Sequence, residues 1–424
     1  MIVLLVIVGI PLLMWGYSSW RKSHEERILA GIVAKGGQFT RSTTPFQQWV
    51  SQFTLLGRRL KFEGVPSDFT IPEPTDEELA YVGGMRLTHG VEIIDGQIDT
   101  RLLTTLAKLP KLHSLVLINC SVGDQELERI IEKIPRPEKL GTLHLQGTTL
   151  TDQGLTSIQR LKELQTLMID ESNIDGSGFL KLEAKYLSSL GLMNSQVNDA
   201  NLKFIVECLG NRLHGLDLTN SRISDAGLRE LVRTGRLMSL AIGGTSVKPD
   251  GVREFLDERY RLEVQQIRQL SLAGFPWTIE DLKNIRLPDN LHKLDLTGWV
   301  IHDADLDQLP NLKNLEILNL SRTRVTDAGL PALMRFQRLR RLHLRGTKVT
   351  NAGLDIALEL PCTSFLEVGE TAITFEGLMA RKYPSGRMQL DVSGMNLTLE
   401  EIRSLTKRRP EGVVYQNDRT FKEY

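Results

Sequence analysis

Residues 315–338, LEILNLSRTRVTDAGLPALMRFQR, are followed directly by a second copy of the same pattern at 339–362, LRRLHLRGTKVTNAGLDIALELPC. Each copy opens with L-x-x-L-x-L, and this alternation predicts a short β-strand with its leucines on one face. Later apolar residues, such as Leu330, Leu333 and Met334, return at intervals of three and four, which predicts a helical segment. A strand and a helix of this size cannot bury their apolar faces alone, so the copies are expected to stack on one another.

The pattern recurs from residue 91 to residue 402. We call the second apolar residue of each L-x-L the reference residue. The positions five and ten after it are apolar in all thirteen copies. The thirteen reference residues are Ile93, Leu117, Leu145, Ile169, Leu192, Leu218, Ile242, Leu272, Leu296, Leu320, Leu344, Val368 and Val392. Because strands pack about 4.8 Å apart and helices about 10 Å apart, we expect an α/β solenoid that curves, with its parallel sheet inside and its helices outside.

The copies, written L-x-x-L-x-L-x-x-T-x-V-T-D-A-G-L, resemble leucine-rich repeats of the cysteine-containing subclass that is found in F-box substrate receptors. They are still more similar to a set of bacterial membrane-anchored leucine-rich repeat proteins, in which Thr or Ser replaces the Cys of that subclass. The stretch EERILAGIVAKGG, residues 25–37, resembles the juxtamembrane segment of that bacterial set. The resemblance covers nearly the whole chain and implies a leucine-rich repeat solenoid, but it implies almost nothing about activity.

Nearly every residue of the N-terminal segment Ile2–Tyr17 is apolar. With Ser18, Ser19 and Trp20 the segment has nineteen residues, which as a helix span about 28 Å, close to the thickness of about 30 Å of a bilayer's hydrocarbon core. No Lys or Arg precedes the run and no clear cleavage site follows it, which favours a retained anchor over a cleaved signal peptide. We therefore expect a transmembrane anchor at residues 1–22, and the basic residues Arg21, Lys22 and Arg27 favour a cytoplasmic repeat domain.

Residues 23–90 do not keep the repeat and are expected to form a juxtamembrane helix and an N-terminal cap over the open end of the stack. Apolar residues between Trp49 and Leu56 predict a further helix, and three prolines within residues 66–74 predict a loop. Thr75-x-x-Glu78 is a capping-box pattern that opens a short helix.

The repeat domain is expected at residues 91–409, followed by a C-terminal cap or tail at 410–424. Within that tail the stretch GVVYQ, residues 412–416, is expected to add a last strand.

The residue three positions after the reference residue is small or weakly polar in ten of the thirteen copies. A Ser or Thr there is expected to hydrogen-bond the backbone of the next copy. Phe275 and Trp299 fill this position with bulk in the two copies that follow the longest spacing, the 30 residues from Ile242 to Leu272. We expect a local distortion of the stack there.

Composition excludes several classes of function. The 424 residues carry 52 basic and 52 acidic side chains, so no net positive charge suggests binding to nucleic acid. Three cysteines form neither a disulfide framework nor a metal-ligand spacing. The histidines do not gather, and no nucleotide, metalloprotease or hydrolase motif is present. The sequence therefore predicts no enzyme, no cofactor and no metal site.

Two polar features recur in the repeat. Asp, or once Asn, lies seven residues after the reference residue in seven copies, and Gly lies nine after it in seven copies. One carboxylate per repeat favours a role at the N-terminus of a helix over a catalytic site. The glycines indicate tight packing between neighbouring copies.

The remaining candidates lie on the strands, alternating with the buried leucines, and therefore face the inside of the curve. The first group is apolar and comprises Val116, Ile118, Met168 and Met193. Such a group indicates a partner site, unless the N-terminal cap folds over it.

The second group is charged. Arg341, His343 and Arg345 project from one predicted strand, with Glu367 and Asp391 on the two strands that follow. These residues form either a ladder of ion pairs that neutralises itself or a site that recognises an acidic peptide or protein patch.

These observations predict a membrane-anchored scaffold that binds a protein or peptide partner on the inner face of the solenoid. The alternative is a substrate-recognition subunit of a larger enzyme complex, similar to the leucine-rich repeat receptors of ubiquitin ligases. The sequence does not indicate the partner, the process or the oligomeric state.

Overall fold

A computed structural model describes most of the chain. The described residues are 27–32, 34–35, 38–42, 54–55, 58–59, 65–85, 88–264, 266–360, 364–381, 383, 388–408, 413–416 and 419–421. They divide into two compact units. The N-terminal unit comprises residues 1–150 and 157–166, and the C-terminal unit comprises 151–156 and 167–424. Each unit is described separately.

The sheet of the N-terminal unit is built from one strand per copy. In order, its parallel strands are β4 (Val65–Pro72), β5 (Gly90–Ile94), β6 (Ser114–Ile118) and β7 (Thr142–Gln146). Strand β1 (Gln38–Ser42) pairs antiparallel with β4. A separate hairpin joins β2 (Thr54–Leu55) to β3 (Arg58–Arg59). Residues 27–32 and 34 are helical. The other helices of this unit are α4 (Asp76–Gly83), α5 (Thr100–Leu106), α6 (Asp124–Lys133) and η2 (Pro137–Lys139). The short helix α7 (Leu155–Ile158) contains residues of both units.

The C-terminal unit repeats the same arrangement with shorter strands. After β8 (Thr166–Asp170), its strands run parallel from β9 to β18, and β19 (Arg419–Phe421) turns back antiparallel to β18. These strands are β9 (Ser189–Gly191), β10 (Gly215–Asp217), β11 (Ser239–Ala241), β12 (Gln269–Ser271), β13 (Lys293–Asp295), β14 (Ile317–Asn319), β15 (Arg341–His343), β16 (Phe365–Glu367), β17 (Gln389–Asp391) and β18 (Val413–Gln416).

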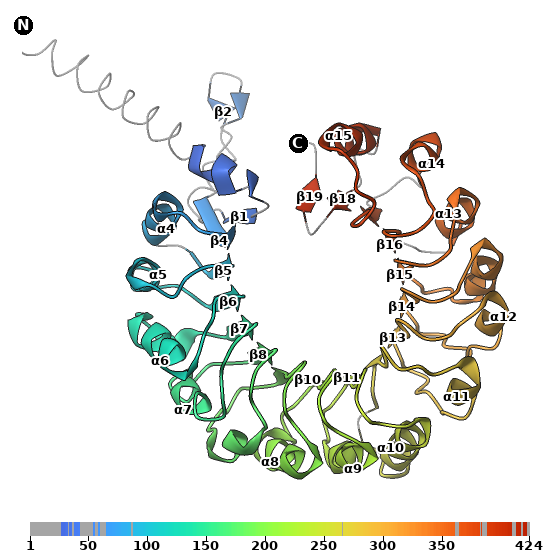
Figure 1. Ribbon diagram of the computed structural model, residues 1–424, viewed down its shortest axis with the longest axis horizontal. Helices are drawn as coiled ribbons and strands as arrows, with labels where there is room; N and C mark the ends of the chain where they lie inside the picture. Colours follow the sequence, from blue (N-terminus) through green and yellow to red (C-terminus); the bar gives the residue numbers. More distant parts are fainter. Residues whose placement is uncertain are drawn as a thin grey trace, which may run out of the picture. The chain divides into compact units, whose positions relative to one another are not determined.

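The helices of the C-terminal unit lie on the side opposite to the strands, which line its inner edge (Figure 1). They are η3 (Ser177–Lys181), α8 (Asp199–Leu209), α9 (Asp225–Glu230), η4 (Leu231–Arg233), α10 (Pro249–Arg261), α11 (Ile279–Lys283), α12 (Asp303–Leu306), η5 (Asp327–Arg335), α13 (Asn351–Leu358), α14 (Phe375–Ala380) and α15 (Leu399–Arg408).

The predicted reference residues form the centre of the core. All thirteen are fully buried, with no side-chain or backbone surface exposed to solvent. In the first four copies the reference residue lies within the strand, and in the other nine it directly follows the strand. The α/β solenoid that the repeat predicts is therefore confirmed.

Two local predictions near the N-terminus are wrong. The prolines between residues 66 and 74 do not form a loop but belong largely to β4, because Phe69 and Ile71 alternate into the core. Pro66 is tolerated because β4 pairs with β5 only from Asp68 onward, and because the β1 register shifts beside it. Thr54 and Leu55, which were expected in a helix, pair as β2 with β3.

The expected distortion near the 30-residue spacing is also absent from the sheet. Leu240, Leu270 and Leu294 pair in unbroken register across β11, β12 and β13. The extra residues instead lengthen α10 to 13 residues. Trp299 is buried at the small-residue position, where its indole N–H donates to the carbonyl of Leu272 at 2.7 Å.

The hydroxyl groups at that position bond differently from the prediction. Thr323 Oγ1 donates to the carbonyl of Leu320 at 2.6 Å, and Thr347 makes the same contact with Leu344. The acceptor is thus the reference residue of the same copy, not the backbone of the next one. The hydroxyl satisfies a carbonyl that faces the turn after the strand.

The predicted membrane anchor, residues 1–22, lies outside the described residues. Among the residues that are described, no helix combines the length and the apolar composition needed to cross a bilayer.

Candidate functional site

The repeated aspartates join each copy to the next. Asp199, at the first turn of α8, accepts hydrogen bonds from Ser224 N at 2.7 Å, Ser224 Oγ at 2.6 Å and Gly227 N at 2.9 Å. Asp303 and Asp327 bind Thr326 and Thr350 in the same way. The acceptor satisfies unpaired N–H groups at the start of the following helix. Each carboxylate therefore caps the helix of the next copy, whereas the sequence suggested its own.

The repeated glycines make room for these aspartates. A Cβ atom at Gly353 would lie 2.1 Å from Asp327 Oδ1, and one at Gly251 would lie 2.1 Å from Asp225 Oδ1. The tight packing predicted at this position is confirmed. Both features serve the stack, and neither forms a catalytic or phosphate-binding site.

The surface available for binding in the C-terminal unit is the face of the strands away from the helices. In each three-residue strand the middle leucine is buried, and the first and third residues point to this strand face. Parallel pairing in register aligns them into two columns. From β9 to β17 the first column reads Ser189, Gly215, Ser239, Gln269, Lys293, Ile317, Arg341, Phe365 and Gln389.

The predicted charged group is partly assembled on this strand face. His343 Nδ1 lies 2.6 Å from Glu367 Oε2 on the neighbouring strand. Arg345 lies 4.0 Å from the other oxygen of Glu367 and 2.7 Å from Glu370 Oε1. The hydrogen bond and charge of Glu370 raise the pKa of Arg345, and the same contact lowers the pKa of Glu370. The ion pairs of Arg345 and the contact of His343 with Glu367 therefore join four side chains into one network, to which Glu370 was not assigned from the sequence.

Arg341 and Asp391 stand outside this network. The guanidinium of Arg341 lies over the ring of Phe365, 5.7 Å from its centre, and the residue is exposed. Among the described residues it forms no ion pair. Asp391 Oδ1 accepts the Ser393 amide at 2.8 Å, so this carboxylate stabilises the turn after β17. Besides Glu370, the sequence analysis missed Phe365, and the signal that could have found it is its place in the first column of the strand face.

The predicted apolar group is divided between the two units. Val116 and Ile118 lie on β6 of the N-terminal unit, and both are half-buried. Met168 and Met193 belong to the C-terminal unit and are also half-buried. Met168 lies across its neighbouring strand, since a Cβ atom at Gly191 would be 2.2 Å from its Sδ. A role of these residues in binding a partner stays a prediction.

A shallow groove, unpredicted from the sequence, crosses the strand face from β8 to β13. We call it the strand-face groove; its volume is about 180 Å³, and Met168 and Lys293 lie at its two ends. Between them the strands carry mainly small residues: Ser189, Gly215, Ser239 and Ala241. Their small side chains leave the backbone of β9 to β11 accessible.

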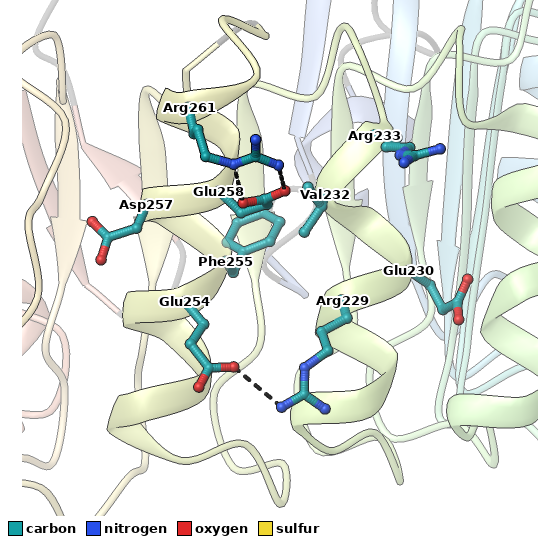
Figure 2. Close-up of a pocket in the computed structure, with 9 residues that line it drawn as sticks. All are labelled: Arg229, Glu230, Val232, Arg233, Glu254, Phe255, Asp257, Glu258 and Arg261. Carbon is teal, nitrogen blue, oxygen red and sulfur yellow. Dashed lines mark hydrogen bonds and ion pairs between the residues drawn. The ribbon is translucent and has the colours of Figure 1, made fainter.

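A larger groove of about 750 Å³ lies on the helical side, between α9–η4 and α10 (Figure 2). Across this groove, Arg229 of α9 forms an ion pair with Glu254 of α10 at 3.1 Å. Within α10, Arg261 pairs with Glu258. The hydrogen bond from Arg261 lowers the pKa of Glu258, so this carboxyl is ionised and unsuited to act as a general acid near neutral pH. The groove's charged walls are largely paired with one another.

The cysteines show no activation. Burial raises the pKa of the Cys120 and Cys208 thiols, which disfavours the reactive thiolate. Cys362 lies outside the described residues. No group of three His, Cys, Asp or Glu side chains is placed to hold a metal ion anywhere in the described ranges.

Comparisons with known proteins give one family match and several weak structural similarities. A family model described as "Leucine Rich repeat" matches residues 311–334, about one copy of the repeat. No curated protein matches the chain. Among solved structures, the leucine-rich repeat protein LIC12759 of Leptospira interrogans is similar at 17% identity and a TM-score of 0.33, covering 82% of this chain and 81% of its own.

Two further structures are similar at the same level. The internalin InlF of Listeria monocytogenes has 15% identity and a TM-score of 0.35, over 84% of this chain and 87% of its own. A chain of the yeast Rad7–Elc1 complex has 16% identity and a TM-score of 0.41, over 93% and 94%. Similarities this weak carry no information about a partner.

Proposed function

We propose that this leucine-rich repeat protein binds a protein partner through the strand face of its C-terminal unit while residues 1–22 hold it in a membrane. A solenoid of this kind is suited to protein–protein interaction. The ten parallel strands β9 to β18 span nine steps of about 4.8 Å, or about 43 Å of rigid surface. A surface of that length accommodates an interface of ordinary size.

One observation carries the proposal. Arg341 is an exposed cation that has no carboxylate partner among the described residues. Beside it, Arg345 pairs with Glu367 and Glu370, and His343 contacts Glu367. The guanidinium is held over the Phe365 ring, which orients it and limits the entropy lost on binding. A free, oriented guanidinium is the group best suited to a carboxylate of a partner. The partner is therefore an acidic segment of a protein or peptide.

The membrane tether rests on the apolar run Ile2–Tyr17. A tethered scaffold meets partners at the same membrane at a raised effective concentration. The basic residues after the run favour a cytoplasmic repeat domain. Protease protection of intact cells and of inverted vesicles tests both statements, because a cytoplasmic domain is cleaved only in the inverted vesicles.

The binding test compares two charge reversals in the full chain. Partners are captured by chemical crosslinking in native membranes, which are then solubilised. Arg341→Glu is expected to abolish capture, whereas Lys313→Glu, at an exposed loop position away from the strand face, is expected to leave it unchanged. Equal capture by both variants, or no captured partner at all, would overturn the proposal.

The alternative of a substrate-recognition subunit remains a prediction from the repeat pattern. Co-purification of ligase components with the full chain would support it. Capture of membrane proteins without such components would favour the scaffold.

A further inference from the structure

We propose that the strand-face groove holds one tryptophan side chain of the same partner, next to an acidic stretch that reaches Lys293 and Arg341. This inference rests on the proposed function and adds the chemistry that the partner must carry. The volume of about 180 Å³ is below the ~300–1,000 Å³ of typical small-molecule pockets. It suits a single large side chain.

The floor of the groove is backbone. Gly215 lines the groove and has no side chain. A Cβ atom there would already lie 3.3 Å from Ser189 Oγ and 3.9 Å from Ser239 Cβ, so glycine at this position leaves room that any larger residue would fill. Met168 forms one wall with its thioether, which lies against Gly191. Thioethers make favourable contacts with aromatic rings, and methionine adapts its shape to the group that it meets.

The polar groups of the groove distinguish tryptophan from phenylalanine. Asp217 lines the groove, and its Oδ1 accepts the Thr219 amide at 2.9 Å. Within the described part of the chain no hydrogen bond engages its second oxygen. An indole N–H, which needs an acceptor when it is buried, can donate to that oxygen.

The first column continues from the groove with cations. Lys293 lies at the end of the groove and forms no ion pair among the residues that the structure describes, and Arg341 lies two strands beyond it. The carboxylate of Asp295 is already occupied, since it accepts hydrogen bonds from Thr297 and Ser271. The two cations therefore remain available for acidic side chains of a partner.

The strand spacing predicts the partner's pattern. Gly215 and Lys293 lie three strands apart, about 14 Å, and Lys293 and Arg341 two strands apart, about 10 Å. An extended segment that crosses the strands advances about 3.3 Å per residue. Side chains alternate along such a segment, so those that face the strands lie an even number of positions apart. The first acidic residue is thus about four positions from the tryptophan and the second about eight, a span of about 26 Å against about 24 Å between Gly215 and Arg341.

The test uses defined peptides and the full chain in detergent. The probes are fluorescein-labelled Trp-Ser-Thr-Ser-Glu-Ser-Thr-Ser-Glu and the same peptide in reverse order, measured by fluorescence anisotropy. We expect one of them to bind, with affinity lost about tenfold or more on replacing Trp by Ala. Replacing both Glu by Gln is expected to weaken binding and to remove its dependence on salt.

Two matched variants of the protein complete the test. Ser239→Phe fills the groove and is expected to abolish binding. Ser114→Phe introduces the same ring at the equivalent register position of β6 and is expected to leave binding unchanged. Circular dichroism and thermal melts show whether both variants remain folded. Should Ser239→Phe fail to fold, Ser239→Leu and the Trp-to-Ala peptide provide the same test.

The inference is overturned if neither peptide binds, if the Trp-to-Ala peptide binds equally well, or if a folded groove-filling variant retains full affinity. If these occur while Arg341→Glu still abolishes capture of the membrane partner, the groove assignment falls and the proposed function stands. If Arg341→Glu also has no effect on capture, both fall.

Discussion

The carboxylate of Asp327 binds the N-terminus of the helix that follows it, accepting the Thr350 amide at 2.7 Å and the Thr350 hydroxyl at 2.6 Å. Thr350 in turn caps its own helix through the Ala352 amide at 3.2 Å. The two residues belong to adjacent copies, so a contact needed by one helix is supplied by its neighbour. Together with the apolar faces that only stacking buries, this contact is a physical reason to expect that a single copy does not fold alone.

Replacing Asp327 by Ala is expected to lower the free energy of unfolding by about 2 kcal/mol, because two charge-assisted hydrogen bonds are lost at a helix N-terminus. Denaturant unfolding followed by circular dichroism measures the change. Asp289→Ala is the control, since Asp289 is exposed and accepts only through its backbone carbonyl. A loss no larger than that of the control would contradict the role given to the aspartate ladder.

Replacing Gly353 by Ala is expected to destabilise the fold by about 2 kcal/mol, because its Cβ would lie 2.1 Å from Asp327 Oδ1. Gly235→Ala is the matched control, since no atom lies within 4 Å of a Cβ at that position. The control is expected to be neutral or to stabilise by up to about 1 kcal/mol through the unfolded chain. If both variants changed the melting temperature equally, close contact between Asp327 and Gly353 would not explain why Asp and Gly recur at these positions of the repeat.

Arg259 is a buried charged residue in α10, the longest of the described helices, and is expected to stabilise the packing of that helix. It is fully buried, and its guanidinium donates to the carbonyls of Leu231, Val232, Thr234 and Leu237 at 3.1–3.2 Å. Burial lowers its pKa to about 10, so it remains charged at neutral pH. Arg259→Met would remove the guanidinium donor from all four carbonyls, of which those of Leu231 and Thr234 keep a backbone N–H donor, and is expected to cost about 3 kcal/mol.

The control for that prediction is Arg261→Met two residues later. Arg261 is exposed and pairs with Glu258, so its loss is expected to cost less than about 1 kcal/mol. Thermal melts of the two variants separate the cases. Similar melting temperatures would show that the buried guanidinium adds nothing to the packing of α10.

The N-terminal unit is expected to lose stability in acid through Glu78. Burial raises the pKa of this carboxyl, but hydrogen bonds from Lys35 and Thr75 outweigh burial and lower the pKa below its ordinary value of 4.5. A depressed pKa in the folded state means that the stabilisation is complete above pH 4.5 and is lost as the pH falls below it.

The difference in unfolding free energy between the native protein and Glu78→Gln measures this contribution. It is expected to be constant at neutral pH and to shrink below pH 4.5. A difference that does not change with pH in acid would contradict the assignment.

The sequence predicted which residues of the repeat are buried and where neighbouring copies meet, but not which backbone groups the repeated hydroxyls and aspartates bind. The thirteen reference residues are all buried, and the glycine spacing correctly indicated close contact between copies. Periodicity is reliable here because each copy must meet the same neighbour in the same way. The non-repeating β4 was missed, since its prolines were weighed above the alternation of Phe69 and Ile71.

The site was only partly predictable for the same reason. The pairing of His343 with Glu367 follows from register alone, because both occupy the third position of adjacent strands. The capture of Arg345 by Glu370 depends on side-chain reach beyond the strand. The strand-face groove exists because Ser189, Gly215 and Ser239 have small side chains or none. A search of the sequence for reactive or charged groups does not single out such residues.

Photo-crosslinking tests the central claim, that a partner lies on the strand face of the C-terminal unit, most directly. A benzophenone amino acid replaces Ile317 on that face in one variant and Leu180, which is 52% exposed in η3, in another. We expect irradiation of native membranes to give an adduct from position 317 that disappears when Arg341→Glu is added, and none from position 180. An adduct from position 180 alone, or one from 317 that survives the Arg341 change, would contradict the account.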